Sequence, residues 1–296
     1  MAIVSLPSTI LVRLFYHLYS RIRFHKHNPE LEMRGPSKEI HPAFAPASLM
    51  SRTSLWETDY NLHKSNSTYF SDLDISRTVL VTDLYTPGME LVRREMEKEV
   101  DRHGKRKYPG RITVMLGSVY CCFKKEIKPY EKYEMQSKIV AWDEKWAYIM
   151  TFFLRPSKRK SQPKTLLAVG VSKYVVKKGR MTVRPERVLR ASGLLPPRPI
   201  GQEESPSPAT TLETPASGEG IDTGESMDEP LLRQVLTLTE DADIDQAVLD
   251  NKKKFEDSAK SSGWDWHKIE QERLRGMSVV RAFVDIDAKL HEEAQL

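Results

Sequence analysis

A run of polar residues with catalytic side-chain types lies between Asp59 and Phe70. Asp59, Asn61 and His63 stand at alternate positions, so a carboxylate, a carboxamide and an imidazole are close along the chain. A carboxylate activates water or attacks a carbonyl carbon, and an imidazole acts near neutral pH as an acid, a base or a hydrogen-bond donor. The spacing therefore predicts a site for attack on a carbonyl group, with Asp59 as base or nucleophile.

A helix is predicted to begin directly after this run. Asn66 and Ser67 have the residue types that cap a helix N-terminus. The first turn of a helix has free backbone N–H groups and the positive end of the dipole, and both stabilise a developing oxyanion. We therefore expect the backbone at Ser65 and Asn66 to form the oxyanion site.

The same residues also have a structural explanation. Asp and Asn side chains commonly stabilise turns by accepting hydrogen bonds from nearby backbone N–H groups. For Asp59 alone this explanation would be preferred. The register of Asn61, His63, Asn66 and Tyr69 with Asp59 favours a functional site.

Hydrophobic periodicity predicts the elements that position the run. A short strand is expected over residues 52–58, and the helix continues to about Leu84. Pro87-Gly88 predicts a break, and a separate charged helix follows over residues 90–100. Strand patterns then cover residues 112–127, 133–142, 146–154 and 165–176, with a turn at 143–145 and a short helix or tail at 184–191. A helix followed by antiparallel strands predicts an α+β domain.

Three blocks of the sequence resemble the hotdog-fold acyl thioesterases. The first is the pattern Asp-x-Asn-x-His-x-x-Asn-x-x-Tyr from Asp59 to Tyr69, and the others are residues 142–148 and 185–189. The resemblance covers roughly residues 50–195 and points to the thioesterase-like branch that includes THEM-type proteins and their fungal relatives. It implies a hotdog fold, in which a curved antiparallel sheet wraps one long central helix.

The resemblance also implies roles and partners. Asp59 is implied as the catalytic carboxylate, while Asn61 and His63 are implied to hold water and substrate. The implied substrate is an acyl thioester of coenzyme A or of an acyl carrier protein, and the reaction needs no metal or other cofactor. Hotdog domains usually pair with the active site at the subunit interface, so a homodimer is expected.

The predicted helix carries further polar residues that support the site. Asp72 and Asp74 are backup carboxylates, because some hotdog enzymes place their catalytic acid on this helix. Asp74 and Arg77 are three residues apart, a spacing at which an ion pair forms. A structural role is the stronger interpretation of both acids, since Asp early in a helix offsets its dipole.

The chain departs from the family pattern directly after the histidine. Lys64-Ser65 stands where relatives usually have Met-Asn or Val-Asn. Two interpretations of this lysine are open. It lies at the mouth of the site and pairs with a phosphate or carboxylate of the substrate, or it is a substitution on the protein surface. Trp142 and Trp146 are weaker candidates for an acyl pocket, for which core or dimer packing is the simpler explanation.

The departure leaves two other functions open. One is a non-catalytic protein of the same fold that binds thioesters or associates with a membrane. The other is an acyl-thioester dehydratase or isomerase. Product analysis separates the latter from hydrolysis, since only hydrolysis releases a free thiol.

Charge is divided unevenly along the 296 residues. Residues 203–296 have 22 acidic and 10 basic side chains, whereas the first 202 residues have a net charge of +17. A basic surface attracts the phosphates of coenzyme A, nucleic acid or anionic lipid, or it is simply solvated. The basic loop over residues 155–164 is explained most simply as a solvated hairpin tip, and contact with the phosphates of coenzyme A is the alternative. With no recognisable nucleic-acid-binding module, we expect no nucleic-acid partner.

The two cysteines indicate the compartment. Cys121 and Cys122 are adjacent in a predicted strand, where a disulfide between them would be strained. The sequence has no disulfide framework and no zinc-ligand spacing. We therefore expect a cytoplasmic protein, or one that faces the cytosol on an intracellular membrane, and not a secreted one.

The rest of the chain is divided by composition. Residues 1–25 are rich in apolar side chains, and Pro7 and Arg13 interrupt them. This pattern predicts membrane contact through an interfacial helix or a short anchor. The alternative is a helix that packs on the protein itself. The C-terminal part contains an amphipathic helix from Trp264 that docks on the core or on a partner. The predicted organisation is an N-terminal segment (1–25), a connector (26–49), a hotdog domain (50–195), a disordered linker (196–230) and a helical extension (231–296).

Overall fold

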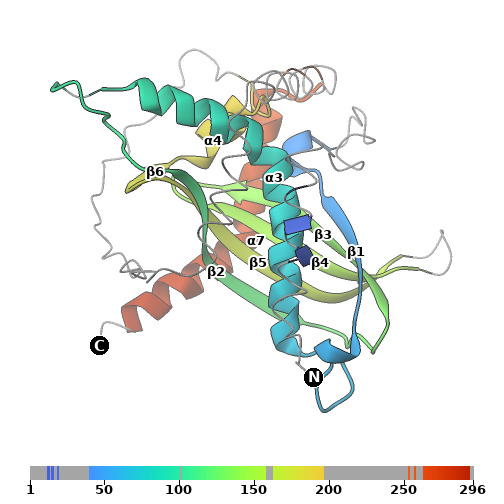
Figure 1. The fold of residues 1–296 in the computed structure, drawn as a ribbon. Coiled ribbons are helices and arrows are strands. Elements are labelled where there is room, and N and C mark those ends of the chain that lie inside the picture. The colour runs from blue at the N-terminus through green and yellow to red at the C-terminus, as the bar shows by residue number, and fades with distance from the viewer. Residues whose placement is uncertain are drawn as a thin grey trace, which may run out of the picture.

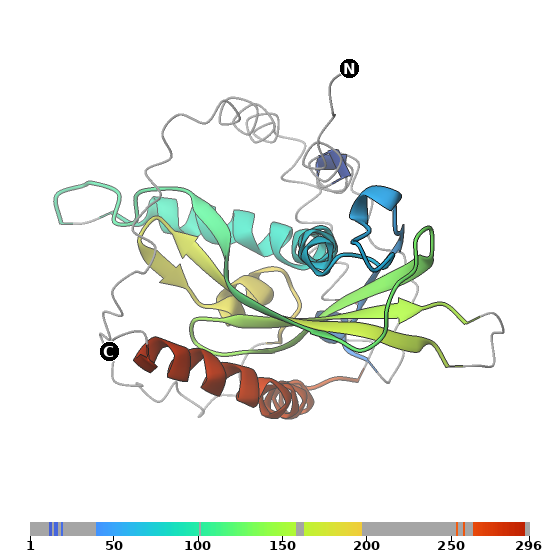
Figure 2. The same cartoon turned by 90° about the horizontal axis from the view of Figure 1, so that it is seen from below.

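The computed structural model describes residues 40–100, 102–157, 163–196 and 263–293, with isolated positions between 12 and 19 and at 253 and 257. Within them, a curved antiparallel sheet lies behind a long helix, α3 (Asn66–Lys98), and a second long helix, α7 (Trp266–Glu293), covers the opposite face (Figures 1 and 2). The fold is therefore α+β, with the central helix and curved sheet of a hotdog domain, as predicted.

The sheet has the strand order β1-β3-β4-β5-β2, with β6 paired to β5. Its strands are β1 (Ala47–Arg52), β2 (Ile112–Phe123), β3 (Lys132–Trp142), β4 (Ala147–Arg155), β5 (Thr165–Lys178) and β6 (Met181–Val183). Every pairing is antiparallel. The four strands predicted from residue 112 onward are confirmed, and the predicted turn closes through a 2.9 Å hydrogen bond from the Asp143 N–H to the Trp146 carbonyl.

The first half of α3 packs closely on the inner face of the sheet. A glycine in β5 leaves room there for a large apolar side chain of the helix. A Cβ atom on Gly170 in β5 would lie 2.6 Å from a methyl carbon of Leu73, so only glycine permits this approach. Leu73 and Tyr69 pack against Tyr133 and Phe153 in one buried cluster. This packing fixes the N-terminal turns of the helix over the sheet.

Two predictions about local structure were wrong. Residues 52–58 do not form a strand, because β1 ends at Arg52 and a 3-10 turn, η2 (Leu55–Glu57), follows. The Glu57 carboxylate accepts a hydrogen bond from the Ser54 N–H and closes this turn. The helix predicted to stop before Pro87 instead continues through it to Lys98.

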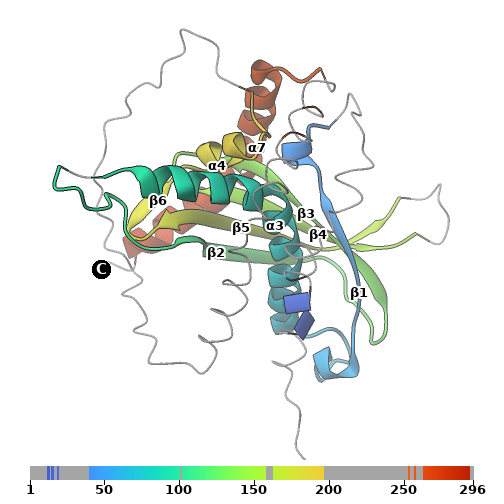
Figure 3. The ribbon, with the colours of Figure 1, turned by 45° about the horizontal axis from the view of Figure 1, so that its top comes forward.

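Helix α3 bends in its second half rather than ending, as Figure 3 shows. Pro87 has no N–H to donate and its ring crowds the preceding turn, which bends a helix. The N–H of Gly88 donates to the Ser192 hydroxyl at 3.0 Å, directly after α4 (Pro185–Ala191). Packing against α4 therefore holds the second half of the helix in place beyond the bend.

The termini add to this domain. Residues 42–44 form a 3-10 turn, η1 (Pro42–Phe44), and β1 begins at residue 47, both inside the predicted connector. Helix α7 docks on the core, since a Cβ atom on Gly276 would lie 1.7 Å from the Val140 carbonyl oxygen in β3. Almost all of residues 1–25 and the whole predicted linker after residue 196 lie outside the described residues. No described helix combines the length and apolar character needed to cross a bilayer.

We predict that Gly88→Ala destabilises the fold even though alanine favours helix. The new methyl group would lie 2.1 Å from the Val188 carbonyl oxygen and 2.4 Å from the Ser192 hydroxyl oxygen. Urea unfolding should show a loss of about 1–3 kcal/mol, the usual cost of overpacking. Lys98→Ala, on an exposed position of the same helix, should stay within about 0.5 kcal/mol of the wild type. A Gly88→Ala variant as stable as the wild type would contradict this packing.

Candidate active site

The residues from Asp59 to Lys64 form a tight loop between η2 and α3. The N–H of Asp59 donates to the His63 carbonyl at 2.9 Å, and Thr58 and Lys64 form an antiparallel bridge at its base. Leu62 at the tip has a φ of 59°, in the left-handed region. The loop is therefore closed by its own backbone and presents its side chains at one end of the sheet.

The Asp59 carboxylate takes part in this turn. Its Oδ1 atom accepts hydrogen bonds from the N–H groups of Asn61 at 2.9 Å and His63 at 3.5 Å. Its Oδ2 atom has no hydrogen-bond partner among the described residues. The structural role considered for Asp59 is thus present, and one carboxylate oxygen is left for chemistry.

The other two predicted catalytic residues lie on the same loop. Asn61 is exposed, and His63 is half-buried with its Nε2 atom 3.4 Å from the Glu126 carboxylate. The N–H of Lys64 donates to the Ile127 carbonyl at 2.8 Å. The segment between β2 and β3 therefore supports the loop from the side.

The oxyanion site predicted at Ser65 and Asn66 is placed one residue further along, at Asn66 and Ser67. The N–H of Ser65 donates to the Glu57 carbonyl at 2.7 Å and is therefore not free. The N–H groups of Asn66 and Ser67 have no acceptor among the described residues. Both belong to the first turn of α3, where free N–H groups are expected.

The Lys64 side chain does not lie at the mouth or on the surface, so both predictions for it were wrong. Its ammonium group is fully buried, 2.9 Å from Asp72 Oδ2 and 3.3 Å from Glu57 Oε2. It also lies over the rings of Tyr69 and Tyr133, 5.6 and 5.5 Å from their centroids. Burial of an ammonium group is costly unless it is paired, and these contacts provide the pairing.

Asp72 is the centre of this buried charge cluster. It accepts a short hydrogen bond from the Tyr133 hydroxyl, and Arg13 Nη1 lies 3.6 Å from its Oδ1 atom. Burial, together with the Asp72 charge, raises the pKa of Tyr133 well above its usual range, so the phenol stays protonated and donates. With Glu57 and Lys64, the cluster contains two cations and two anions. Asp72 therefore holds a buried charge cluster together, whereas the structural role expected for it was to offset the helix dipole.

Arg13 also donates to the Ser51 hydroxyl at 3.0 Å in β1. At this residue the N-terminal segment packs on the protein's own domain, which was one of the alternatives for residues 1–25. Sequence patterns did not identify Glu57 or Tyr133 as part of the cluster. Tyr133 lies 61 positions from Asp72, so no local spacing could have linked them.

The remaining predicted residues lie away from the loop or only support it. The expected ion pair between Asp74 and Arg77 is present, and the buried Arg77 also donates to the Ser172 hydroxyl at 2.5 Å. Trp142 is buried against Phe44 at a ring distance of 5.6 Å. Trp146 packs in the cluster that includes Val280 of α7. Both tryptophans therefore belong to clusters other than that of Tyr69, which favours core packing over an acyl pocket.

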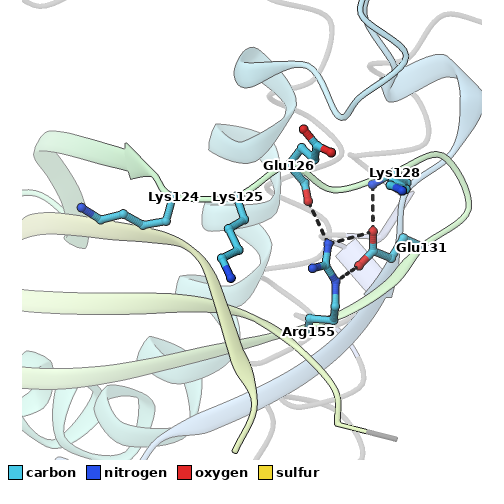
Figure 4. A pocket seen from close by; sticks show the side chains of 6 residues that line it. All are labelled: Lys124, Lys125, Glu126, Lys128, Glu131 and Arg155. Atoms are coloured by element: carbon cyan, nitrogen blue, oxygen red, sulfur yellow. Dashed lines mark hydrogen bonds and ion pairs between the residues drawn. The ribbon is translucent and has the colours of Figure 1, made fainter.

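A basic hollow of about 730 Å³ opens beside the loop (Figure 4). It is lined by Lys124, Lys125, Glu126, Lys128, Glu131 and Arg155. Arg155 is held by the Glu131 carboxylate and the Glu126 carbonyl, whereas the side chains of Lys124 and Lys125 extend away from this group. Glu126 joins the hollow to the loop through His63. Of these residues, only Arg155 lies in the basic loop for which contact with coenzyme A phosphates was the alternative to a solvated hairpin tip.

We predict that Lys64→Met destabilises the protein, because it leaves the buried Asp72 carboxylate without its nearest cation. Urea unfolding at pH 7 should show a loss of about 3–5 kcal/mol. Adding Asp72→Asn should cost less than the sum of the single changes, because the two residues interact directly. Lys124→Met, on an exposed lysine, should leave the free energy of unfolding nearly unchanged. Wild-type stability in Lys64→Met would show that the buried pair is not required.

Known thioesterases resemble this chain in sequence over most of its length. The sequence model of the thioesterase-like superfamily matches residues 53–190. Thioesterase lcsJ of Purpureocillium lilacinum is 34% identical over 307 residues, covering 97% of this chain and 88% of that protein. The probable thioesterase atnL of Emericella nidulans is 42% identical over 159 residues, covering 47% of this chain and 51% of that protein.

Among solved structures, a thioesterase superfamily protein from Jannaschia sp. CCS1 matches with a TM-score of 0.36 and 16% identity, over 56% of this chain and 89% of that one. The match to lcsJ spans nearly the whole of both chains. The superfamily match includes the whole Asp59–Lys64 loop and all of α3. This chain therefore belongs to the thioesterase-like superfamily.

Proposed function

We propose that this protein hydrolyses acyl thioesters at the Asp59–Lys64 loop. The observation that supports this most is the placement of the Asp59 carboxylate, with one oxygen unpartnered among the described residues, just before the first turn of α3. A thioester carbonyl bound there would meet a carboxylate on one side and helix N–H donors on the other. This arrangement suits addition to a carbonyl carbon.

Two chemical routes use the same geometry. As a general base, Asp59 takes a proton from a water molecule while the water oxygen bonds to the carbonyl carbon, and collapse of the intermediate releases the thiol. As a nucleophile, Asp59 forms an anhydride with the acyl group and expels the thiolate, and water then hydrolyses the anhydride. In both routes the N–H groups of Asn66 and Ser67 stabilise the oxyanion. His63, held by Glu126, and Asn61 position the water and the substrate.

The proposed substrate is an acyl group on a phosphopantetheine thiol, as in coenzyme A or an acyl carrier protein. Lys124, Lys125 and Lys128 are exposed beside the loop, and their charge would attract the phosphates of such a carrier. Both carriers present the same thioester and the same phosphate next to the pantetheine arm. The proposed reaction requires no metal or other cofactor.

The test is release of free thiol from a panel of acyl-coenzyme A substrates by the full chain. Asp59→Asn keeps the size of the side chain and removes its basicity, so kcat/KM should fall by about 10²–10⁴-fold. Asp285→Asn, on an exposed position of α7, is the matched control and should keep wild-type activity. Circular dichroism should show both variants to be folded. A folded Asp59→Asn variant with wild-type turnover would refute the assignment of this residue.

A homodimer formed along β2 is part of the proposal. Strand β2 pairs with β5 alone among the described strands, so its outer edge offers unpaired backbone groups. Met115, Leu116 and Tyr120 on this strand are 52%, 43% and 53% exposed. A second copy adding its own β2 would satisfy the edge and cover these side chains.

Sedimentation equilibrium tests this interface. Met115→Lys should shift the protein from dimer to monomer, because a lysine at the pairing edge would oppose its counterpart. Met50→Lys is the matched control, since Met50 is 55% exposed on β1 at the opposite edge of the sheet. A wild type that remains monomeric at all concentrations, or a Met115→Lys variant that remains dimeric, would rule out this interface.

A further inference from the structure

The described N-terminal positions have an exposed apolar side. The described positions between residues 12 and 19 are all helical, and Val12, Tyr16 and Tyr19 among them are exposed. Positions i, i+4 and i+7 lie on one side of a helix, so these three side chains point in the same direction. Arg13 holds these turns on the domain through contacts with β1 and α3. The exposed apolar side is therefore presented outward from a fixed position.

A second group of exposed apolar side chains lies at the catalytic loop. Trp56 in η2 is 81% exposed, and Tyr60 and Leu62 in the loop are 93% and 71% exposed. The exposed Tyr130 lies near η2, because its N–H donates at 2.9 Å to the carbonyl of Thr53, two residues before η2 begins. Single exposed apolar residues are common, but a cluster of them marks an interaction site.

The two groups border the same side of the domain. Figure 2 shows η2 and the described N-terminal turns on the side of α3 that faces away from the sheet. Asp72 of α3 joins the groups, because Arg13 lies 3.6 Å from its carboxylate and Lys64, at the end of the loop, lies 2.9 Å from it. The seven side chains are named together as the apolar face: Val12, Tyr16, Tyr19, Trp56, Tyr60, Leu62 and Tyr130.

Basic residues flank the apolar face on both sides. Residues 1–27 contain three arginines, one lysine and no acidic residue. Residues 124–132 support the catalytic loop and contain four exposed lysines and two glutamates. Of the nearby acids, Glu131 is paired with Arg155 and Glu57 with Lys64. The surroundings of the face therefore have a net positive charge.

We propose that the apolar face docks on the surface of an anionic lipid bilayer. Tyrosine and tryptophan rings favour the boundary between headgroups and acyl chains, because each has an apolar body and a polar group. The flanking lysines and arginines are attracted to anionic headgroups. A second copy of this chain on the same face would instead bring like charges together, which opposes association. The charge pattern therefore selects a bilayer as the partner.

This docking has a consequence for the catalytic loop. Tyr60 and Leu62 belong to the loop that carries Asp59, so the loop would meet the bilayer surface directly. Long acyl chains partition into bilayers, so an acyl thioester would be concentrated at this surface. The inference does not depend on the proposed hydrolysis, because binding to vesicles is measured without a substrate.

Flotation of the full chain with vesicles tests the partner. Binding to phosphatidylcholine vesicles that contain about 30% phosphatidylserine should be at least about tenfold stronger than binding to pure phosphatidylcholine vesicles. Sodium chloride at about 0.5 M should remove most of this difference, because salt screens the attraction between the lysines and the headgroups. Absence of binding to the anionic vesicles would overturn the proposal.

Substitutions at exposed positions test the surface. Tyr16→Ser and Trp56→Ser, one from each group, should each lower the partition coefficient at least about threefold, because less apolar area enters the bilayer. The double variant should lower it at least about tenfold. Leu290→Ser is the matched control, since Leu290 is 64% exposed on α7 at the opposite face of the sheet, and it should bind as the wild type does. Equal losses in Trp56→Ser and Leu290→Ser would contradict the assigned surface.

Fluorescence quenching tests whether the part of the face at the catalytic loop reaches the bilayer. Vesicles that contain brominated phosphatidylcholine should quench the tryptophan fluorescence of the wild type. Most of this quenching should be lost in Trp56→Phe, which keeps an apolar ring. Unchanged quenching in Trp56→Phe would overturn the proposal. So would a wild type that ignores vesicles and forms a dimer that Trp56→Ser dissociates, since the face would then join two copies.

Discussion

The ion pair between Lys64 and Asp72 is the interaction on which the candidate active site depends. Lys64 ends the loop that carries Asp59 and His63, and Asp72 lies two turns into α3, so the pair ties the loop to the central helix. Tyr133 from β3 and Glu57 from η2 complete the pairing. Because a buried charge without its partner is costly, the loop has little freedom to move away from the helix while the protein stays folded.

The two faces of the sheet pack against different helices. The inner face of the sheet holds the first half of α3, where Gly170 allows close packing with Leu73, and this end of the helix meets the loop. The outer face holds α7, where Gly276 allows an equally close approach to β3. The chemistry proposed at one end of α3 and the docking of α7 therefore use opposite faces of the sheet.

Sequence patterns predicted what depends on neighbours along the chain. The alternation of residues identified β3 and β4 closely, and the polar run before Asn66 located both the loop and the helix start. They failed at Pro87, because its local preference to end a helix is outweighed by packing on α4, which Gly88 and Ser192 make possible. They also failed at Lys64, because its ammonium group pairs with Asp72 and Glu57 and lies over the ring of Tyr133 on β3. The local pattern around Pro87 or Lys64 does not predict these tertiary contacts.

The most direct test of this account is amide hydrogen exchange at the loop. In the wild type, the N–H groups of Asp59, Lys64 and Ser65 donate to backbone carbonyls and should be protected. In Lys64→Met, under conditions where the strands β3 and β4 remain protected, we predict that these loop amides exchange at least about tenfold faster, since a loss of 1.4 kcal/mol already gives that factor. Unchanged protection of the loop in that variant would contradict the claim that the buried pair holds the active site in place.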